Sequence, residues 1–298
     1  MKQIGNIINF INHHPLASRH RVKAYSNFLL WQLSQTVYPH EKQISFVNGT
    51  KLIVKKGMTG ATGNIYTGLH DFEDMVFLLH LLTPGDLFFD IGANVGSYSI
   101  LAGGCAGSRV IAVEPIRETF NYLQKNIRVN NLEDKITALN IGLSDHKGTL
   151  HFTTAFDTVN HVLDMNEKNE ESKSQHVEVD TFDELTFNNG IPVLTKIDVE
   201  GYEYKVLEGM MHTLQSDRLK AIIIELNGSG RRYGYNDEEI HQMLKSYGYY
   251  PFSYDPFRRF LTPLNHFGTV NTIYIKDENF VKDRIANAHK IKVFSEEL

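Results

Sequence analysis

The sequence predicts an α/β protein built on a mostly parallel seven-stranded sheet with helices on both faces. From residue 86 onward, apolar runs short enough for buried strands alternate with segments whose apolar residues recur at helical spacing. The stretch from Asp86 to Tyr98 combines an apolar run, a tight glycine turn and the start of a helix. A unit of this kind places backbone N–H groups at the sheet edge where open α/β folds bind ligands.

The composition of the chain excludes several classes of protein. Its 298 residues, 42% of them hydrophobic, are enough for one large α/β domain with additions. A formal net charge of −5 does not favour a nucleic-acid partner. The single cysteine, Cys105, excludes an intramolecular disulfide framework. No apolar run has the length of a membrane span, and polar residues interrupt the N-terminus, so we expect a cytoplasmic protein without a transmembrane segment or secretory signal.

Residues 1–84 are expected to form an N-terminal cap of helices and a hairpin that lies over the ligand. Residues 1–40 show helical apolar stripes, and such helices pack on their own domain or on a dimer partner, which leaves a homodimer open. Two strand-like runs around Asn48-Gly49 predict the hairpin. The glycine-rich residues 57–68 are expected to be a loop, and residues 71–82 a helix.

Residues 85–280 are expected to form the ligand-binding domain, followed by a short charged tail at 281–298. The expected core strands are 87–91, 109–113, 136–141, 193–197, 220–226, 249–254 and 269–275. Helices are expected around 120–127, 206–214 and 237–247, the last of them capped by Asn236. Residues 149–153 and 177–181 resemble an added strand pair, with a polar, exposed loop at 166–175.

The glycine turn does not match the common nucleotide-binding motifs. The dinucleotide fingerprint G-x-G-x-x-G fails because Asn94 stands between Gly92 and Gly96, and no G-K-[ST] is present. The pattern D-x-G-A-N-x-G resembles instead motif I of the class I S-adenosylmethionine (SAM) methyltransferases. Asn tolerates a left-handed turn, the glycines let the backbone approach the methionine part of SAM, and Asp90 would supply an acceptor near its ammonium. The competing interpretation is an ordinary strand–helix turn.

Glu114 ends the second expected strand, at the position where this fold binds the two ribose hydroxyls of its cofactor. A carboxylate can accept both hydrogen bonds at once. Glu114 also lies roughly twenty residues beyond the glycine turn, near the offset expected for that role. The alternative is a solvent-facing glutamate at a strand end.

Several motifs that occur in one order make the resemblance more specific. They are the glycine turn, Glu114-Pro115, Asn140–Ser144, Val179–Asp183 and Lys196-Ile-Asp-Val-Glu-Gly201. Together they resemble the FkbM family of SAM-dependent methyltransferases over residues 85–225, with an extension to 275. The family implies a Rossmann-like class I fold with an antiparallel final strand, SAM as cofactor, and O-methylation of natural products or of sugars in glycans and glycolipids. By position, the resemblance assigns SAM binding to Asp90, Gly92, Ala93, Asn94, Gly96, Ser99, Glu114 and Pro115, with Ile141 and Gly142 bordering the adenine.

The same resemblance places Asp198 and Glu200 against the transferred methyl group. Because a sugar hydroxyl is a poor nucleophile, a positioned base helps, and Glu200 is the first candidate, while Asp198 would bond SAM or the acceptor. His70 and His161 are secondary candidates, since neutral imidazole accepts protons near pH 7, against the simpler interpretation as surface or structural histidines. Asp198 and Glu200 are also suitable Mg²⁺ ligands, but two carboxylates are too few to decide, and no metal is expected.

The expected acceptor is a small molecule or glycan that carries a phosphate or carboxylate. Guanidinium groups bind such anions in a bidentate manner, and aromatic rings stack on sugars. Two loops that should emerge at the SAM edge supply these groups: Arg231, Arg232 and Tyr233 in one, and Tyr254, Phe257, Arg258 and Arg259 in or beside the other. The alternative is that the arginines are solvated or pair with Asp237, Glu238 and Asp255. Two further functions stay open, a metal-dependent small-molecule O-methyltransferase and a non-enzymatic SAM-fold scaffold.

Overall fold

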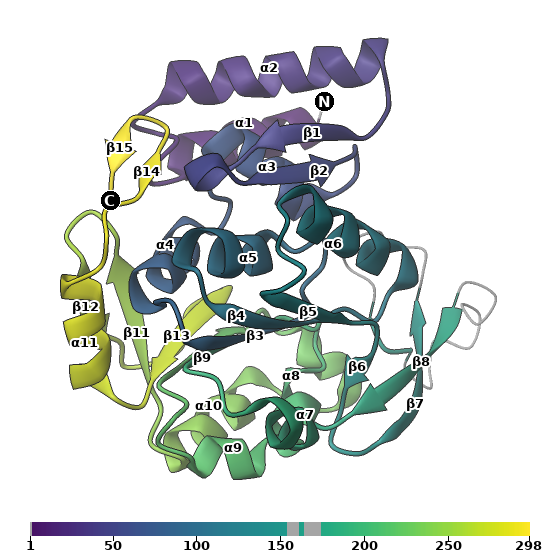
Figure 1. Cartoon of the computed structure of the whole chain (residues 1–298), viewed down its shortest axis with the longest axis vertical. Coiled ribbons are helices and arrows are strands. Elements are labelled where there is room, and N and C mark those ends of the chain that lie inside the picture. Colours follow the sequence, from purple (N-terminus) through teal and green to yellow (C-terminus); the bar gives the residue numbers. More distant parts are fainter. Residues whose placement is uncertain (1, 154–160, 164–173) are drawn as a thin grey trace.

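A computed structural model describes residues 2–153, 161–163 and 174–298 of the chain. Its centre is an eight-stranded mixed sheet with the order β12-β11-β13-β10-β9-β3-β4-β5 (Figure 1). The strands are β3 Leu87–Ile91, β4 Arg109–Val113, β5 Ile136–Leu139, β9 Leu194–Ile197, β10 Ala221–Glu225, β11 Tyr250–Asp255, β12 Phe260–Pro263 and β13 Asn271–Ile275. All seven expected strands are present, and the α/β fold class is confirmed.

The central strands run parallel, and their apolar residues are covered on both faces of the sheet. Every residue of β3 and β9 is buried, as expected for strands in the middle of such a sheet. The last strand, β13, pairs antiparallel with β10, which confirms the expected final strand. The eighth strand, β12, was not expected; it pairs antiparallel with β11, and its burial pattern leaves only Leu261 buried. An edge strand with one buried residue has almost no apolar signal in the sequence.

Helices cover both faces of the sheet. The sheet separates two apolar cores, one on each face. One face carries α4 Phe72–Leu81, α5 Ser97–Ile100, α6 Arg117–Val129 and, above them, the N-terminal layer. The other face carries α7 Phe182–Asn189, α8 Glu203–Glu208, α9 Met211–Gln215 and α10 Asp237–Ser246. The predicted helix at 206–214 is therefore divided into two short helices. Helix α10 begins with a capping box between Asn236 and Glu239, as expected.

The N-terminal layer contains α1 Lys2–His13, α2 Arg21–Val37 and the hairpin of β1 Lys42–Ser45 and β2 Lys51–Val54. In Figure 1 it lies over α4, α5 and α6. The expectation of a loop at 57–68 was wrong, because residues Thr59–Thr67 form helix α3. Its glycines are tolerated because they let neighbouring groups approach closely: a Cβ at Gly63 would lie 2.1 Å from the His70 ring.

The C-terminal residues pack against the rest of the fold. Helix α11 Glu278–Ala286 crosses the expected boundary at 280 and packs on α4. The two-residue strands β14 Lys292–Val293 and β15 Glu296–Glu297 then form a hairpin beside the N-terminal layer (Figure 1). Apolar side chains hold this hairpin in place, since Ile291, Val293 and Leu298 are buried. The division of the chain into three domains stays a prediction.

A small second sheet follows β5. It joins β6 Gly142–Leu143, β8 Ser174–Asp180 and β7 Gly148–Thr153, with β8 in the middle. Strands β7 and β8 are the expected added pair, although both begin earlier than expected. Most of the polar loop expected at 166–175 lies outside the described residues. Within the described part of the chain, no helix has the length and apolar character needed to cross a membrane.

Candidate active site

The glycine turn after β3 is held by the neighbouring strands. The N–H groups of Gly92 and Ala93 donate to the carbonyl of Val113, at 3.0 and 2.9 Å. Gly92, Asn94 and Gly96 all have positive φ angles, of 79°, 52° and 93°. A Cβ at Gly92 would lie only 1.7 Å from the carbonyl oxygen of Asp198. Glycine is therefore required there, because the ends of β3 and β9 approach each other so closely.

Asp90, the last polar residue of β3, has one oxygen that is buried and without a partner. Its Oδ2 accepts a hydrogen bond from the Ser99 hydroxyl at 2.6 Å, whereas Oδ1 has no hydrogen-bond partner among the described residues. Burial raises the pKa of Asp90, although the nearby ammonium of Lys196 opposes this rise. An orphaned buried acceptor is costly, so this oxygen fits a hydrogen-bond donor supplied by a ligand.

Glu114 faces the same space from the end of β4. Its Oε2 accepts from the N–H of Asn94 and its Oε1 from the N–H of Ile116, both at 2.9 Å. Burial raises the pKa of this carboxyl to about 7. Since each carboxylate oxygen has two acceptor positions, both oxygens retain one for a ligand hydroxyl. Glu114 therefore has a structural role in holding the glycine turn, and it can still bind a ribose.

Two cavities meet at this edge of the sheet. The first, called here the β4-side cavity, is lined by Gly92, Asn94, Glu114, Pro115, Gly142, Asp198 and Glu200, among others. The second, called here the β3-side cavity, is lined by His70, Asp90, Gly92, Ala93, Asn94, Lys196 and Asp198, among others. Their shared residues are Gly92, Asn94 and Asp198, so an elongated ligand that crosses the glycine turn would occupy both. Of the pair expected near the adenine, Gly142 lines the β4-side cavity, whereas Ile141 packs against the apolar core of α7–α10.

Three carboxylates converge where β9 and β10 end. One oxygen each of Asp198, Glu200 and Glu225 lie within 4.8 Å of one another. Burial, followed by repulsion from Asp198, raises the pKa of Glu200 to about 7, and the same causes raise that of Glu225. Glu200 has a φ angle of 54°, a left-handed conformation that is unusual for a residue with a side chain. The cluster can hold a proton, and its oxygens are also of a type that binds divalent cations.

Lys196 neutralises part of this charge from inside the sheet. Its ammonium lies 2.5 Å from Asp198 Oδ2, and its side chain is almost fully buried. Burial alone would lower the pKa of Lys196, but the carboxylates of Asp198 and Asp90 raise it above its ordinary value. The ammonium also lies 4.8 Å from the centre of the Tyr98 ring. Lys196 is therefore charged and fixes the position of Asp198.

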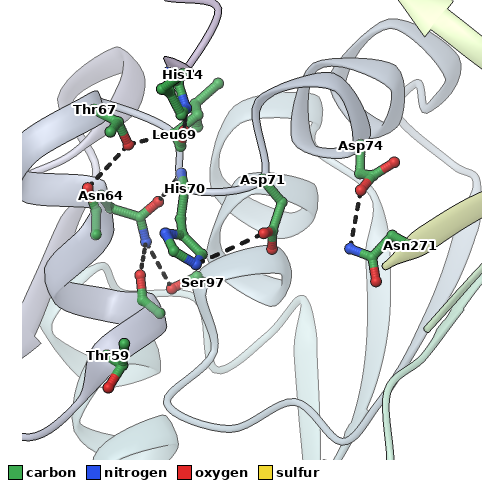
Figure 2. A network of polar contacts seen from close by, with 12 residues as sticks. His14, Thr59, Asn64, Thr67, Leu69, His70, Asp71, Asp74, Ser97 and Asn271 are labelled. Carbon is green, nitrogen blue, oxygen red and sulfur yellow. Dashed lines mark hydrogen bonds and ion pairs between the residues drawn. The ribbon is translucent and has the colours of Figure 1, made fainter. Parts of the chain in front are cut away.

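His70 lines the β3-side cavity together with the glycine turn, and Figure 2 shows it beside Asn64, Asp71 and Ser97. Its backbone N–H donates to Asn64 Oδ1 at 2.7 Å, and the Asn64 amide donates to the Ser97 hydroxyl at 3.2 Å. The Nε2 of His70 lies 3.8 Å from Asp71 Oδ1, while its Nδ1 is buried and has no partner among the described residues. The Tyr98 hydroxyl donates to Asp71 Oδ2 at 3.1 Å. This network connects α3 to the first residues of α5.

His14 supports the same network as a structural histidine. Its Nδ1 accepts from the backbone N–H groups of Leu16 and Ala17, so Nε2 carries the proton that is donated to the carbonyl of Leu69 at 2.8 Å. Burial lowers the pKa of His14 to about 4, which keeps the ring neutral. The other histidine considered from the sequence, His161, is buried beside β7 and bonds Thr153 through its backbone.

The proposed acceptor-binding side chains are dispersed. Arg231 and Arg232 are exposed in the short helical turn Ser229–Tyr233, and the Tyr233 hydroxyl donates to the carbonyl of Val162 at 2.6 Å. Arg258 is 81% exposed and lies 3.6 Å from Asp255. Arg259 instead donates to the backbone carbonyls of Ala288 and Leu298. Tyr254 is buried, and its hydroxyl lies 2.6 Å from Nδ1 of His80.

Three residues at the site were missed in the sequence. Lys196 had a signal, because a lysine inside an otherwise apolar strand is almost never buried without a partner. Glu225 also had a signal, because it is the last residue of β10 and Asp198 directly follows the parallel strand β9. Parallel neighbouring strands bring their carboxyl ends to the same edge of a sheet. Asp71 had no comparable signal. Its position depends on how the N-terminal layer packs, which local pattern does not reveal.

The chain is similar to known methyltransferases. The family model described as "Methyltransferase FkbM domain" matches residues 90–251. A curated relative, the hexuronic acid methyltransferase AglP of Haloferax volcanii, is 29% identical over 158 residues. That match covers 52% of this chain and 62% of the relative, so the chain spans less than two thirds of its length.

Solved structures of methyltransferases match the chain at low sequence identity and low TM-scores. A precorrin-6y C5,15-methyltransferase from Geobacter metallireducens is 14% identical, with a TM-score of 0.40, over 70% of this chain and 88% of that one. A putative methyltransferase from Streptococcus mutans, in complex with SAH, is 10% identical, with a TM-score of 0.40, over 68% and 96% of the two chains. The family match covers more than half of the sequence and includes the glycine turn, Glu114, Asp198 and Glu200. The chain therefore belongs to the FkbM methyltransferase family.

Proposed function

We propose that this protein is a SAM-dependent O-methyltransferase that acts on a hydroxyl group of a polar acceptor, a sugar or glycan. The proposal rests on one observation: the two cavities share Asp198, which lies beside the glycine turn and belongs to the cluster of three carboxylates. The curated relative named as a hexuronic acid methyltransferase supports a sugar as the acceptor class.

The residues at the glycine turn fit SAM. The buried, unpartnered Oδ1 of Asp90 suits the ammonium of the methionine part, and the remaining acceptor positions of Glu114 suit the two ribose hydroxyls. Gly92 leaves the backbone bare where the two cavities join. Pro115 and Gly142 line the β4-side cavity, where the adenine would bind.

The carboxylates would bind and deprotonate the acceptor. When bound, SAM would supply a methyl group carried on a sulfonium sulfur, and this sulfur would keep the electron pair of the S–C bond when the methyl carbon is bonded by the acceptor oxygen. Glu200, whose pKa is raised, would take the proton of the acceptor hydroxyl once its own carboxyl group is ionised. Asp198, held by Lys196, orients the acceptor or the cofactor. His70 is the second candidate for the proton acceptor, because it lines the β3-side cavity beside Asp198.

Calorimetric titration with SAM and its demethylated product SAH tests the cofactor assignment. We expect both to bind wild type and to bind Glu114→Gln at least tenfold more weakly, because an amide has one acceptor oxygen and its NH₂ would face an N–H donor. Glu133→Gln is the matched control, since Glu133 is exposed. Equal affinity for Glu114→Gln would remove the ribose role, and failure of wild type to bind either ligand would refute the proposal.

A metal-dependent transfer is the second candidate, because Asp198, Glu200 and Glu225 together offer three carboxylate oxygens. Transfer of labelled methyl groups should be measured after dialysis against EDTA and after Mg²⁺ is restored. Loss and recovery of activity would favour the metal-dependent reaction, and unchanged activity would exclude it. Cofactor binding without transfer to any sugar would instead favour a non-enzymatic SAM-fold protein.

A further inference from the structure

A groove of about 820 Å³ opens beside the candidate active site. It lies between α1, the segment from His70 to Asp74 and residues of β11 and β13. Its volume is within the range of about 300–1,000 Å³ that is usual for ligand sites. The groove shares His70 and Asp71 with the β3-side cavity, which also contains Asp198. The groove and the β3-side cavity are therefore neighbours, with His70 and Asp71 in the wall of both.

The side chains that line the groove combine carboxylates, amides and aromatic rings. Aromatic rings can stack on sugar rings, and amides and carboxylates bond sugar hydroxyls. The carboxylates are Asp71, Glu73 and Asp74, and the amides and rings include Asn6, Asn9, Asn271, Phe10 and Phe72. Among the described residues that line the groove, none is a lysine or an arginine. Arg19, which stacks on Phe257 at 3.6 Å, is outside this lining.

Two of the groove's carboxylates are fixed by neighbouring elements (Figure 2). Asp74 Oδ2 accepts from the amide of Asn271 at 2.9 Å. Asn271 begins β13 and pairs with Glu225 at the end of β10, so this part of the groove is joined to the carboxylate cluster. Asp71 accepts from the Tyr98 hydroxyl. The negative charge is therefore a built feature of the groove wall.

We propose that this groove is the acceptor site and that its carboxylates select neutral and amino sugars over sugar acids. This inference rests on the proposed methyltransferase function. A carboxylate or phosphate on the acceptor would meet like charges and no lysine or arginine in the described lining, whereas an ammonium would be attracted. Arg231, Arg232 and Arg258, which favoured an anionic acceptor in the sequence, are not among the residues that line the groove.

A matched series of acceptors tests the charge preference. Methyl glycosides of a neutral hexose, a 2-amino-2-deoxyhexose and a hexuronic acid are offered with labelled SAM at pH 8. Burial raises the pKa of Asp74 to about 7, so a pH of 8 favours the charged form of this carboxyl. We expect the KM of the hexuronide to be at least tenfold above that of the neutral hexoside. In Glu73→Lys, which places a cation at the exposed Glu73, the ratio of the hexuronide KM to the KM of the neutral hexoside should fall at least tenfold.

Glu133→Lys is the control, since it makes the same charge change at an exposed position outside the groove. The affinity for SAH should be equal in wild type and both variants. Binding of the three glycosides to the SAH-loaded protein, measured by saturation-transfer NMR, gives the preference even without turnover. Equal or better binding of the hexuronide by wild type overturns the inference, as does binding of no glycoside. A larger effect of Arg231→Ala than of Glu73→Lys on the KM of the hexuronide also overturns it.

Failure of this inference can be distinguished from failure of the proposed function. Wild type that binds the glycosides in the expected order but never transfers a methyl group contradicts the enzyme and leaves the groove standing. Wild type that methylates the hexuronide best contradicts the groove and leaves the enzyme standing. Wild type that does not bind SAH contradicts the cofactor assignment.

Discussion

In the proposed reaction Glu200 and His70 are the two candidates for the proton acceptor, and a pH profile separates them. Glu200 has a pKa raised to about 7 by burial and by Asp198, so it becomes a base only as the pH rises through that value. The rate of methyl transfer should therefore rise with pH through about 7. In Glu200→Gln we expect the rate to fall by about 10²-fold or more and this rise to disappear.

The matched variant is His70→Asn, which should retain the rise near pH 7 if Glu200 is the base. Loss of the rise in His70→Asn, together with its retention in Glu200→Gln, would assign the proton transfer to His70 instead. Both profiles should be measured with SAM and the acceptor at saturating concentrations, so that binding does not contribute.

Asp198 differs from Glu200 because its removal affects folding as well as turnover. From the sequence alone, both carboxylates are expected to matter more for turnover than for stability. In the structure, Asp198→Asn leaves the buried ammonium of Lys196 without its ion-pair partner. Breaking a buried pair costs about 3–5 kcal/mol, and the partial exposure of Asp198 reduces the expected loss to about 2 kcal/mol.

Chemical denaturation of Asp198→Asn measures this loss, and Asp198→Asn combined with Lys196→Met should recover most of it. Glu278→Gln is the control, because the Lys282–Glu278 pair is exposed and should contribute under about 0.5 kcal/mol. A stability of Asp198→Asn equal to that of wild type would show that Lys196 finds another partner, such as Asp90.

At the scale of single elements, helix α3 shows where sequence patterns are insufficient. Its glycines predicted a loop, because glycine is a poor helix former. The helix forms nevertheless, since the His70 ring packs against Gly63 and the Asn64 side chain bonds the backbone of His70. Both partners lie outside the helix. The strong strands β3, β4 and β10 needed no such information, because their apolar runs identify them.

Two glycines of α3 offer a matched pair of substitutions. Gly63→Ala would place its Cβ 2.1 Å from His70 Nδ1, whereas a Cβ at Gly60 would lie 4.0 Å from the ring. Alanine favours the helix at both positions by roughly 1 kcal/mol. We expect Gly60→Ala to raise the melting temperature with unchanged activity, and Gly63→Ala to displace His70 and lower activity. Equal activity in the two variants would show that the position of the His70 ring is unimportant.

At the scale of the whole molecule, buried acids should make stability depend on pH in an unusual direction. Burial raises the pKa values of Asp74, Glu114, Glu200 and Glu203 to about 7, and that of Glu225 is raised too. An acid whose pKa is higher in the folded state than in the unfolded state stabilises the fold at a pH below its unfolded pKa. This contribution is lost as the pH rises through the folded-state pKa. His14 and His80, with pKa values lowered to about 4, act in the opposite sense but are fewer.

The free energy of unfolding should therefore fall between pH 5 and pH 8, by about 1 kcal/mol or more. Denaturation with urea at both pH values measures the difference. Glu203→Gln should weaken the dependence, because Glu203 is buried and accepts from the N–H groups of Val199 and Gly201 through one oxygen that glutamine retains. Greater stability at pH 8 than at pH 5 would contradict the assignment of these acids.

Local sequence predicted the strands of the sheet better than it predicted the site. The motifs that end β3, β4 and β9 meet at one edge because parallel strands require it, and this is why Asp90, Glu114, Asp198 and Glu200 lie together. The groove was missed because its walls come from α1, α4 and β13, which are distant in sequence and meet only through packing. The assignment of the arginines to acceptor binding stays a prediction, and Arg232 is close enough to Glu200 for its charge to oppose the rise in the pKa of that carboxyl.

The left-handed backbone of Glu200 has a consequence for the evolution of this protein. A residue with a side chain loses about 1 kcal/mol in that conformation, whereas glycine adopts it freely. Selection for heat resistance alone would therefore favour glycine at position 200, beside Gly201. If Glu200 is the proton acceptor that we propose, a library screened for stability without an activity assay should drift towards stable, inactive variants at this position.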